Sequence, residues 1–229
     1  MRVLVTRPSE DCEETARQLV LRGHQPLAAP LLTTSFWDGA EVTLEGVQAI
    51  LATSANGVRA LARRSIRRDV PLFAVGPQTA SEAQGAGFAN VKNANGDAVA
   101  LAEATRRWAA PDKGALLHIG GQGNDGKLVS LLAGFSIRQE ILYAVTAVET
   151  MPQAAALALR QGQVDAALFY SPRSAGVFRD CARKEQLPVE SLIAVCISQA
   201  AAAALAPLGF RAVRLAARPN QDSLLDTLD

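Results

Sequence analysis

Short apolar runs alternate with amphipathic segments along the whole chain, and this alternation restricts the fold more than any other feature of the sequence. Parallel strands need a crossover connection, most often a helix, so the pattern predicts an α/β protein with parallel sheets. Several runs are almost entirely apolar, as in strands that are covered on both faces. The expected strands are 2–6, 26–32, 48–53, 71–75, 89–92, 115–119, 138–145, 164–170, 191–197 and 211–215. The expected helices are 9–23, 56–65, 77–87, 97–109, 123–134, 152–161, 173–184, 199–208 and 220–228.

Parts of the chain resemble each other, which indicates an internal duplication. The segment "AILATSANGV" (49–58) is similar to "ALFYSPRSAGV" (167–177). Further along, "LFAVGPQTASEAQGAGF" (72–88) is similar to "AVCISQAAAAALAPLGF" (194–210). The opening "VLVTRP" is matched more weakly by "LLHIGG" (116–121).

The order of the matching parts indicates that one copy is inserted into the other. The opening strand–helix–strand corresponds to the end of the middle region, so it completes the last copy. We therefore expect a discontinuous α/β domain of residues 1–34 and 150–229, and an inserted α/β domain of residues 38–146. The β-rich crossings near 33–38 and 146–151 are expected to pair as a two-stranded hinge.

Charge and cysteine content narrow the possible partners and sites. A formal net charge of +1 gives no reason to expect nucleic acid or a membrane surface as a partner. No segment approaches the apolar length of a membrane span. Cys12, Cys181 and Cys196 lack metal-ligand spacing and are expected to be reduced thiols in a cytoplasmic protein without a metal.

Residues for acid–base or phosphate chemistry are scarce. His24 and His118 are the only histidines, and we expect ordinary surface and core residues there. The glycines of "GGQGNDGK" (120–127) have the wrong spacing for a phosphate loop. The basic cluster "RRSIRR" (63–68) is expected to be a solvated helix end rather than a surface that steers substrate.

Polar residues and glycines follow most of the expected strands, directly before a helix. Ligands bind outside the carboxyl ends of the strands in open parallel sheets, and the helix N-termini there favour an anion. Each hydroxyl or amide could instead be only an N-cap, and this alternative stays open for every one of them. The candidates are Arg7, Ser54, Asn56, Gly76, Gln78, Thr79, Gly120, Gly121, Ser171, Arg173, Ser174 and Ser198.

Taken in order, "VLVTRP", "ATSANGV", "AVGPQTA", "LLHIGG", "ILYAV", "YSPRSA" and "CISQAAAAAL" resemble the uroporphyrinogen-III synthase family over essentially the whole chain. The resemblance implies two flavodoxin-like domains joined by a β-ladder hinge, with the active site in the cleft. It implies a cofactor-free lyase of tetrapyrrole biosynthesis that cyclises hydroxymethylbilane, a linear substrate with eight carboxylates. Loss of the ring A hydroxyl would give an azafulvene, and a spiro intermediate would then invert ring D. Positioning and electrostatic stabilisation can drive such a reaction without a strong acid or nucleophile.

The resemblance also implies roles for individual residues. Tyr143 in "ILYAV" matches the tyrosine that assists departure of the ring A hydroxyl, although a core aromatic at a strand end is the alternative. Thr79 matches a hydroxyl residue of the family and is the second catalytic candidate. Arg7, Ser54 and Ser171 match contacts to substrate carboxylates. In the turn of Ser198, Ala200 and Ala201 stand where hydroxyl residues are common.

Partners and alternative functions complete these expectations. The family implies a monomer whose substrate could be handed over by the synthase of hydroxymethylbilane. A non-catalytic two-domain ligand-binding or regulatory module with the same fold is the main alternative. A nucleotide or sugar-phosphate enzyme is a weaker one, because the sequence has neither a phosphate loop nor a set of metal ligands.

Overall fold

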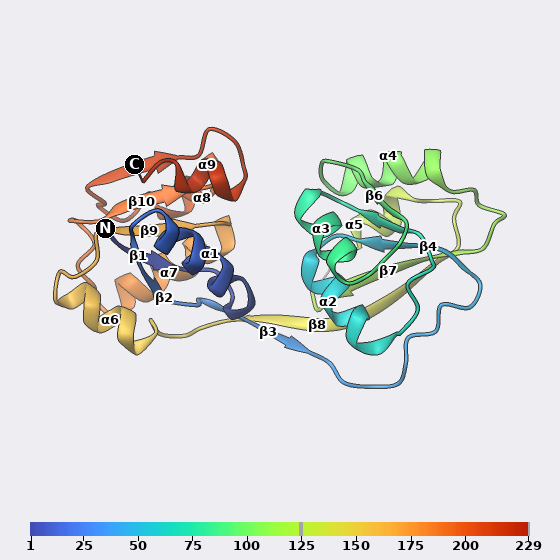
Figure 1. Ribbon diagram of the computed structural model, residues 1–229, viewed down its shortest axis with the longest axis horizontal. Coiled ribbons are helices and arrows are strands. Elements are labelled where there is room, and N and C mark those ends of the chain that lie inside the picture. Colours follow the sequence, from blue (N-terminus) through green and yellow to red (C-terminus); the bar gives the residue numbers. More distant parts are fainter. Residues whose placement is uncertain (124–125, 229) are drawn as a thin grey trace. The chain divides into compact units, whose positions relative to one another are not determined.

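The structure is a computed structural model that describes residues 1–123 and 126–228 (Figure 1). The chain forms two compact units. Unit 1 comprises Met1–Thr33 and Thr146–Asp229, and unit 2 comprises Thr34–Val145. Each unit is built around its own β-sheet. No helix in the described part of the chain combines the length and the apolar composition that crossing a membrane requires.

Unit 1 contains a five-stranded parallel sheet in the order β11-β10-β9-β1-β2. Its strands are β1 (Arg2–Val5), β2 (Gln25–Ala28), β9 (Ala166–Phe169), β10 (Ile193–Cys196) and β11 (Ala212–Leu215). Its helices are α1 (Ser9–Leu21), α6 (Gln153–Arg160), α7 (Pro172–Lys184), α8 (Gln199–Leu205) and α9 (Gln221–Leu225). Successive strand residues point to opposite faces, so one apolar cluster joins the sheet to α6, α7 and α8 and another joins it to α1 and α9.

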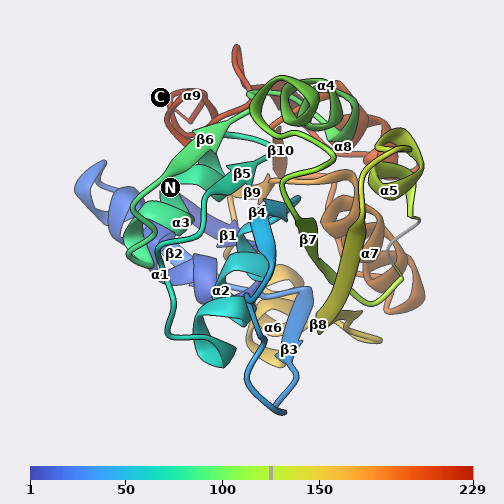
Figure 2. The same cartoon turned by 90° about the vertical axis from the view of Figure 1, so that its right-hand side faces the viewer.

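Unit 2 contains a six-stranded sheet in the order β3-β8-β7-β4-β5-β6. Its strands are β3 (Leu32–Phe36), β4 (Val47–Ala52), β5 (Leu72–Ala74), β6 (Val91–Asn93), β7 (Ala115–Gly121) and β8 (Ile137–Ala147). Its helices are α2 (Ala55–Arg64), α3 (Pro77–Gly85), α4 (Ala98–Trp108) and α5 (Lys127–Leu131). Helices α2 and α3 pack on one face of the sheet, and α4 and α5 pack on the other (Figure 2).

The two sheets have the same strand order once the insertion is taken into account. Numbered along the chain, the strands of unit 1 lie in the flavodoxin-like order 2-1-3-4-5. In unit 2 the order is the same if β3 is left out and β7, β8, β4, β5 and β6 are numbered 1 to 5. Strand β7 therefore corresponds to β1 and β4 to β9, as the sequence similarities predict. The predicted fold class of two duplicated parallel α/β units is confirmed.

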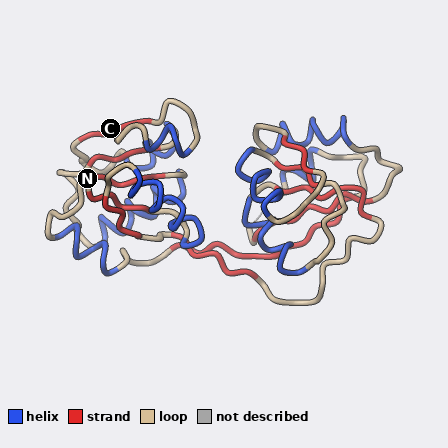
Figure 3. The backbone as a smooth tube through the Cα atoms, viewed as in Figure 1, coloured by secondary structure: helices blue, strands red, loops and turns tan. Residues whose placement is uncertain are grey.

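Strands β3 and β8 carry the chain between the units (Figure 3). The N–H of Val148 donates to the carbonyl of Leu31 at 3.0 Å, and the N–H of Trp37 donates to that of Leu142 at 2.9 Å. The partners advance in opposite directions along the two segments, so β3 and β8 are antiparallel.

Most predicted elements differ from the structure by only a few residues at their ends, and two differ more. The strand expected at 26–32 is divided, because β2 ends at Ala28 and β3 begins at Leu32. Pro30 lies in the gap and has no N–H to donate to a neighbouring strand. The helix expected at 123–134 is limited to α5, which follows Gly126 in the left-handed conformation (φ 69°). Residues 124–125 of that prediction lie outside the described residues.

We expect Phe178→Ala to lower the free energy of unfolding by about 3–5 kcal/mol. Phe178 is fully buried in unit 1, and its ring centroid lies 5.1 Å from that of Phe169 in an edge-on contact. Urea unfolding followed by circular dichroism measures the change. Leu157→Ala is the control, because Leu157 is 54% exposed and its truncation should cost far less. Equal losses for both variants would contradict the prediction.

Candidate functional site

The candidate site residues lie at the carboxyl ends of the strands, where parallel sheets bind ligands. In each sheet, the strands that follow along the chain lie outward in opposite directions from one central pair of neighbouring strands. This pair is β1 and β9 in unit 1, and β7 and β4 in unit 2. The turns that follow β1, β9 and β4 contain Arg7, Ser171 and Ser54, and Gly121 is the last residue of β7. The structure therefore places Arg7 and Ser171 at the topological switch point of unit 1 and Ser54 and Gly121 at that of unit 2. Ser198 and the turn of Gly76 follow the neighbouring strands β10 and β5.

In unit 2, Ser54 and Tyr143 are hydrogen-bonded. Ser54 directly precedes α2 as its N-cap, and its Oγ accepts the N–H of Gly57 at 3.1 Å. Tyr143 comes from β8, and its hydroxyl lies 2.7 Å from Ser54 Oγ. Tyr143 is 8% exposed, and its ring centroid lies 6.4 Å from that of Phe36. Two residues far apart in the sequence thus form one hydrogen-bonded pair at the carboxyl ends of the strands.

Gly120 and Gly121 end β7 next to this pair. Gly120 is buried and Gly121 is partly buried. A Cβ atom on Gly121 would lie only 2.7 Å from the Tyr143 ring. A glycine at position 121 therefore provides space for the tyrosine, a role that the sequence motif did not indicate. Substrate binding by these glycines stays a prediction.

Asn56 is engaged with two other side chains. Its Nδ2 donates to Thr34 Oγ1 at 3.2 Å, and its Oδ1 accepts from Arg59 at 3.1 Å. Arg59 also forms an ion pair with Glu82 at 2.7 Å. Sequence reasoning missed Thr34, which lies in the β-rich crossing segment and belongs to no recognisable motif.

The first turn of α3 contains Gly76, Gln78 and Thr79. Gly76 is the N-cap, Pro77 follows it, and no side chain in the described part of the chain caps this helix. Gln78 is exposed, whereas Thr79 is only 5% exposed. Main-chain N–H groups in the first turn of a helix have no intrahelical acceptor, so this turn can bind an anion.

Two of the candidate serines of unit 1, Ser171 and Ser198, act as N-caps. Ser171 Oγ accepts the N–H of the buried Ser174 at 3.1 Å at the start of α7. Ser198 Oγ accepts the N–H of Ala201 at 3.3 Å at the start of α8. Arg173 is exposed in the first turn of α7. The capping alternative is thus realised for Ser54, Ser171 and Ser198, while ligand contact stays a prediction.

Arg7 is held in a polar network within unit 1. Its guanidinium donates to Asp11 at 2.9 Å and to Gln221 Oε1 at 2.9 Å, and it lies 4.3 Å from the centre of the Tyr170 ring. The side chain is 12% exposed. Burial raises the pKa of Tyr170 although the nearby Arg7 acts in the opposite direction. Thr15 donates to the same Gln221 oxygen at 3.1 Å, so α1 and α9 together orient Arg7.

The histidines and the basic cluster do not join the candidate site. His118 is buried in β7, and its Nδ1 lies 3.3 Å from Gln139 Nε2, as expected for a core histidine. The arginines of 63–68 support unit 2: Arg63 stacks on Phe36, and Arg68 donates to several carbonyl groups and lies over the Phe88 ring. The described residues contain no group of three potential metal ligands.

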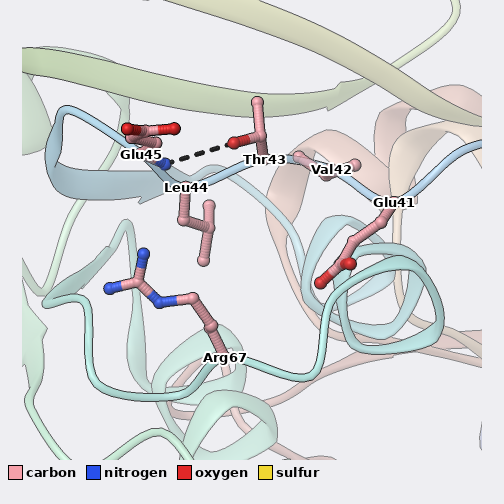
Figure 4. A pocket seen from close by; sticks show the side chains of 6 residues that line it. All are labelled: Glu41, Val42, Thr43, Leu44, Glu45 and Arg67. Carbon is pink, nitrogen blue, oxygen red and sulfur yellow. Dashed lines mark hydrogen bonds between the residues drawn. The ribbon is translucent and has the colours of Figure 1, made fainter.

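A hollow of about 480 Å³ lies elsewhere in unit 2 (Figure 4). It is lined by residues 41–45 and by Arg67, which forms an ion pair with Asp69 at 2.6 Å. These residues precede β4 and β5, so the hollow is at the amino-terminal edge of the sheet. No predicted site residue lines it.

Comparisons with known proteins identify the class of protein. A family model described as "Uroporphyrinogen-III synthase HemD" matches residues 13–226. This chain is a duplicated α/β protein with the fold of tetrapyrrole-cyclising enzymes. It belongs to the uroporphyrinogen-III synthase family.

Solved structures have the same fold. The uroporphyrinogen-III synthetase of Helicobacter pylori matches with a TM-score of 0.67 and 17% identity, over 100% of this chain and 98% of that one. A mutant uroporphyrinogen III synthase of Thermus thermophilus matches with a TM-score of 0.54 and 19% identity, over 100% and 97% of the two chains. No curated protein sequence matches this chain.

We expect His118 to make the stability of the protein depend on pH. Burial lowers the pKa of His118, so the folded state favours the neutral imidazole. Its contribution is fully present above the unfolded pKa of about 6.5 and is lost as the pH falls from there toward the lower folded pKa. Urea unfolding of the unsubstituted chain should therefore show a stability loss as the pH falls below about 6.5, and this loss should be smaller in His118→Gln. An identical loss in both proteins would contradict this.

Proposed function

We propose that this chain is the enzyme that converts hydroxymethylbilane into uroporphyrinogen III. The reaction closes the macrocycle, releases water and inverts ring D. Family membership supports the reaction, and the hydrogen-bonded pair of Ser54 and Tyr143 at the switch point of unit 2 is the observation that carries the assignment of the site. No observation favours a non-catalytic binding module.

The proposed reaction begins at the ring A hydroxymethyl group. Its C–O bond breaks, the electron pair leaves with oxygen, and the proton of the Tyr143 hydroxyl converts the departing group into water. The remaining azafulvene is attacked by ring D through its substituted α-carbon, which gives the spiro intermediate. Fragmentation and reclosure attach ring D in the inverted sense. The proton that ring D then loses balances the proton given up by the phenol.

Tyr143 suits this role by its position. The hydroxyl is at the carboxyl-terminal edge of the sheet, and Ser54 holds it there. A general acid of this kind contributes roughly 10²–10⁴-fold to a rate. The orientation of a long linear substrate supplies the larger part of the selectivity, because closure without inversion gives a different isomer.

The substrate carboxylates require cationic or N–H-rich surroundings. The uncapped first turn of α3, with Gln78 and Thr79, offers main-chain N–H groups to one of them. We assign further carboxylates to Arg7 and to the first turns of α7 and α8, where Ser171, Ser198 and Arg173 lie. Arg7 would then keep Asp11 as a partner and share its remaining N–H groups with the substrate.

The proposal also covers the reaction class, the oligomeric state and the cellular location of the protein. The reaction makes the chain a cyclising carbon–oxygen lyase, and the mechanism needs no cofactor. We propose that it acts as a monomer in the cytoplasm and receives hydroxymethylbilane from the enzyme that makes it. The three buried thiols of Cys12, Cys181 and Cys196 suit a reducing compartment.

A product assay tests the function directly. Hydroxymethylbilane is generated in situ by its own synthase, the chain is added, and the uroporphyrinogen isomers are separated after oxidation. We expect mainly the type III isomer, against type I in the reaction without the chain. Type I alone in both reactions would refute the proposed function.

A second experiment tests the tyrosine. We expect Tyr143→Phe to lower kcat by about 100-fold or more, because the phenol proton is lost while the ring stays. Thr105→Val is the matched control, since it removes a buried hydroxyl that bonds the carbonyl of Leu101 within α4, at 2.7 Å. If Tyr143→Phe keeps the control's rate, Tyr143 is not the acid.

A further inference from the structure

The register between β7 and β8 changes by one residue just before Tyr143. The strands pair up to Gly120 opposite Ile141, but the next partner of Gly121 is Tyr143. Leu142 is therefore an extra residue on β8, and it packs in the same apolar cluster as Tyr143 although the two are adjacent in the chain. An extra residue turns the following side chain to the other face of a strand. This shift directs the Tyr143 ring toward β7 and the start of α2.

Two glycines leave the space that the arrangement needs. A Cβ on Gly121 would lie 2.7 Å from two ring atoms of Tyr143 and 3.1 Å from its hydroxyl oxygen. A Cβ on Gly57 would lie 3.1 Å from the carbonyl oxygen of Ile119 in β7. The second glycine lets the first turn of α2 pack closely on β7, and the first lets the ring lie beside that strand. Together they bring Tyr143 within reach of Ser54.

Ser54 connects the tyrosine hydroxyl to the first turn of α2. Its oxygen accepts the Gly57 N–H at 3.1 Å and lies 2.7 Å from the Tyr143 oxygen. With the helix N–H on one lone pair, the serine can still donate its own proton. When that proton is donated to Tyr143, the phenol proton is available to a group outside the pair. If Tyr143 instead donated to Ser54, the phenol proton would be held in a hydrogen bond within the protein.

We propose that Ser54 is a positioning residue that acts on the substrate through Tyr143, and that it is not itself a ligand of a substrate carboxylate. The hydrogen bonds then run from the Gly57 N–H through Ser54 and Tyr143 to the departing hydroxyl, and each donor strengthens the next. Negative charge that develops on the phenol oxygen lies near the positive end of α2. This inference rests on the proposed function, because the departing hydroxyl belongs to hydroxymethylbilane.

A spectroscopic experiment without substrate tests the link between the two side chains. The chain has only two tyrosines, Tyr143 and Tyr170, so biosynthetic 3-fluorotyrosine gives two ¹⁹F resonances, and Tyr143→Phe assigns them. We expect Ser54→Ala to shift the Tyr143 resonance and Ser54→Thr to restore it, because threonine keeps the hydroxyl. Ser198→Ala is the matched control, since it removes an N-cap of the same kind from α8. An unchanged Tyr143 resonance in Ser54→Ala would overturn the inference.

Steady-state kinetics separate positioning from direct substrate binding. We expect Ser54→Ala to lower kcat about tenfold or more with little change in KM, and Ser54→Thr to recover most of it. Gly121→Ala should also lower kcat, because its Cβ displaces the tyrosine ring. A raised KM with unchanged kcat in Ser54→Ala would make Ser54 a carboxylate ligand and overturn the inference.

The two proposals fail in different ways. If the unsubstituted chain produces no type III isomer, the proposed function fails, and the catalytic role of the pair fails with it. If the chain produces the type III isomer while Ser54→Ala keeps the full kcat, only the role of Ser54 is refuted. Circular dichroism of each variant confirms that it is folded before its rate is interpreted.

Discussion

Parallel strand pairing is the constraint on which the rest of this structure depends. Because neighbouring strands run in the same direction, the carboxyl ends of the parallel strands of a sheet lie along one edge, and helices follow them there. The same edge therefore collects helix N-termini with their unpaired N–H groups. A strongly anionic substrate suits such an edge, whereas the opposite edge of unit 2 carries the structural contacts of Arg67 and Arg68. The placement of the candidate site follows from strand direction.

The second residue after a strand, which starts the next helix as its N-cap, can have two roles in this fold. Ser54, Ser171 and Ser198 each satisfy an N–H of the helix that follows them. Only Ser54 also contacts a tyrosine hydroxyl in the described structure, and the turn of Gly76 leaves its helix without any side-chain cap. The two copies have thus diverged at equivalent turns while keeping the same strand order. Equivalent turns can bear different chemistry because the sheet tolerates any residue that can start a helix.

Much of the fold could be predicted from periodicity, but the pairing of residues in the site could not. Apolar runs and amphipathic segments located nearly every strand and helix, since burial imposes a period of two or of 3.6 residues. Nothing in "ILYAV" indicates that β8 gains an extra residue against β7, and so the neighbours of Tyr143 were not predictable. Thr34 and Gln221 were missed for a related reason, because each meets its partner only after distant segments come together.

The sequence by itself determined the class of fold, the duplicated order of its parts, and the turns that contain the candidate site residues. It did so because hydrophobic period and turn chemistry are local properties that each segment carries within it. Only the tertiary structure decided that Ser54 meets Tyr143, that Gly121 makes room for the ring, and that Asp11 and Gln221 hold Arg7. Those contacts depend on strand register and on how closely a helix packs against its sheet. Both are set by the packing of the whole unit.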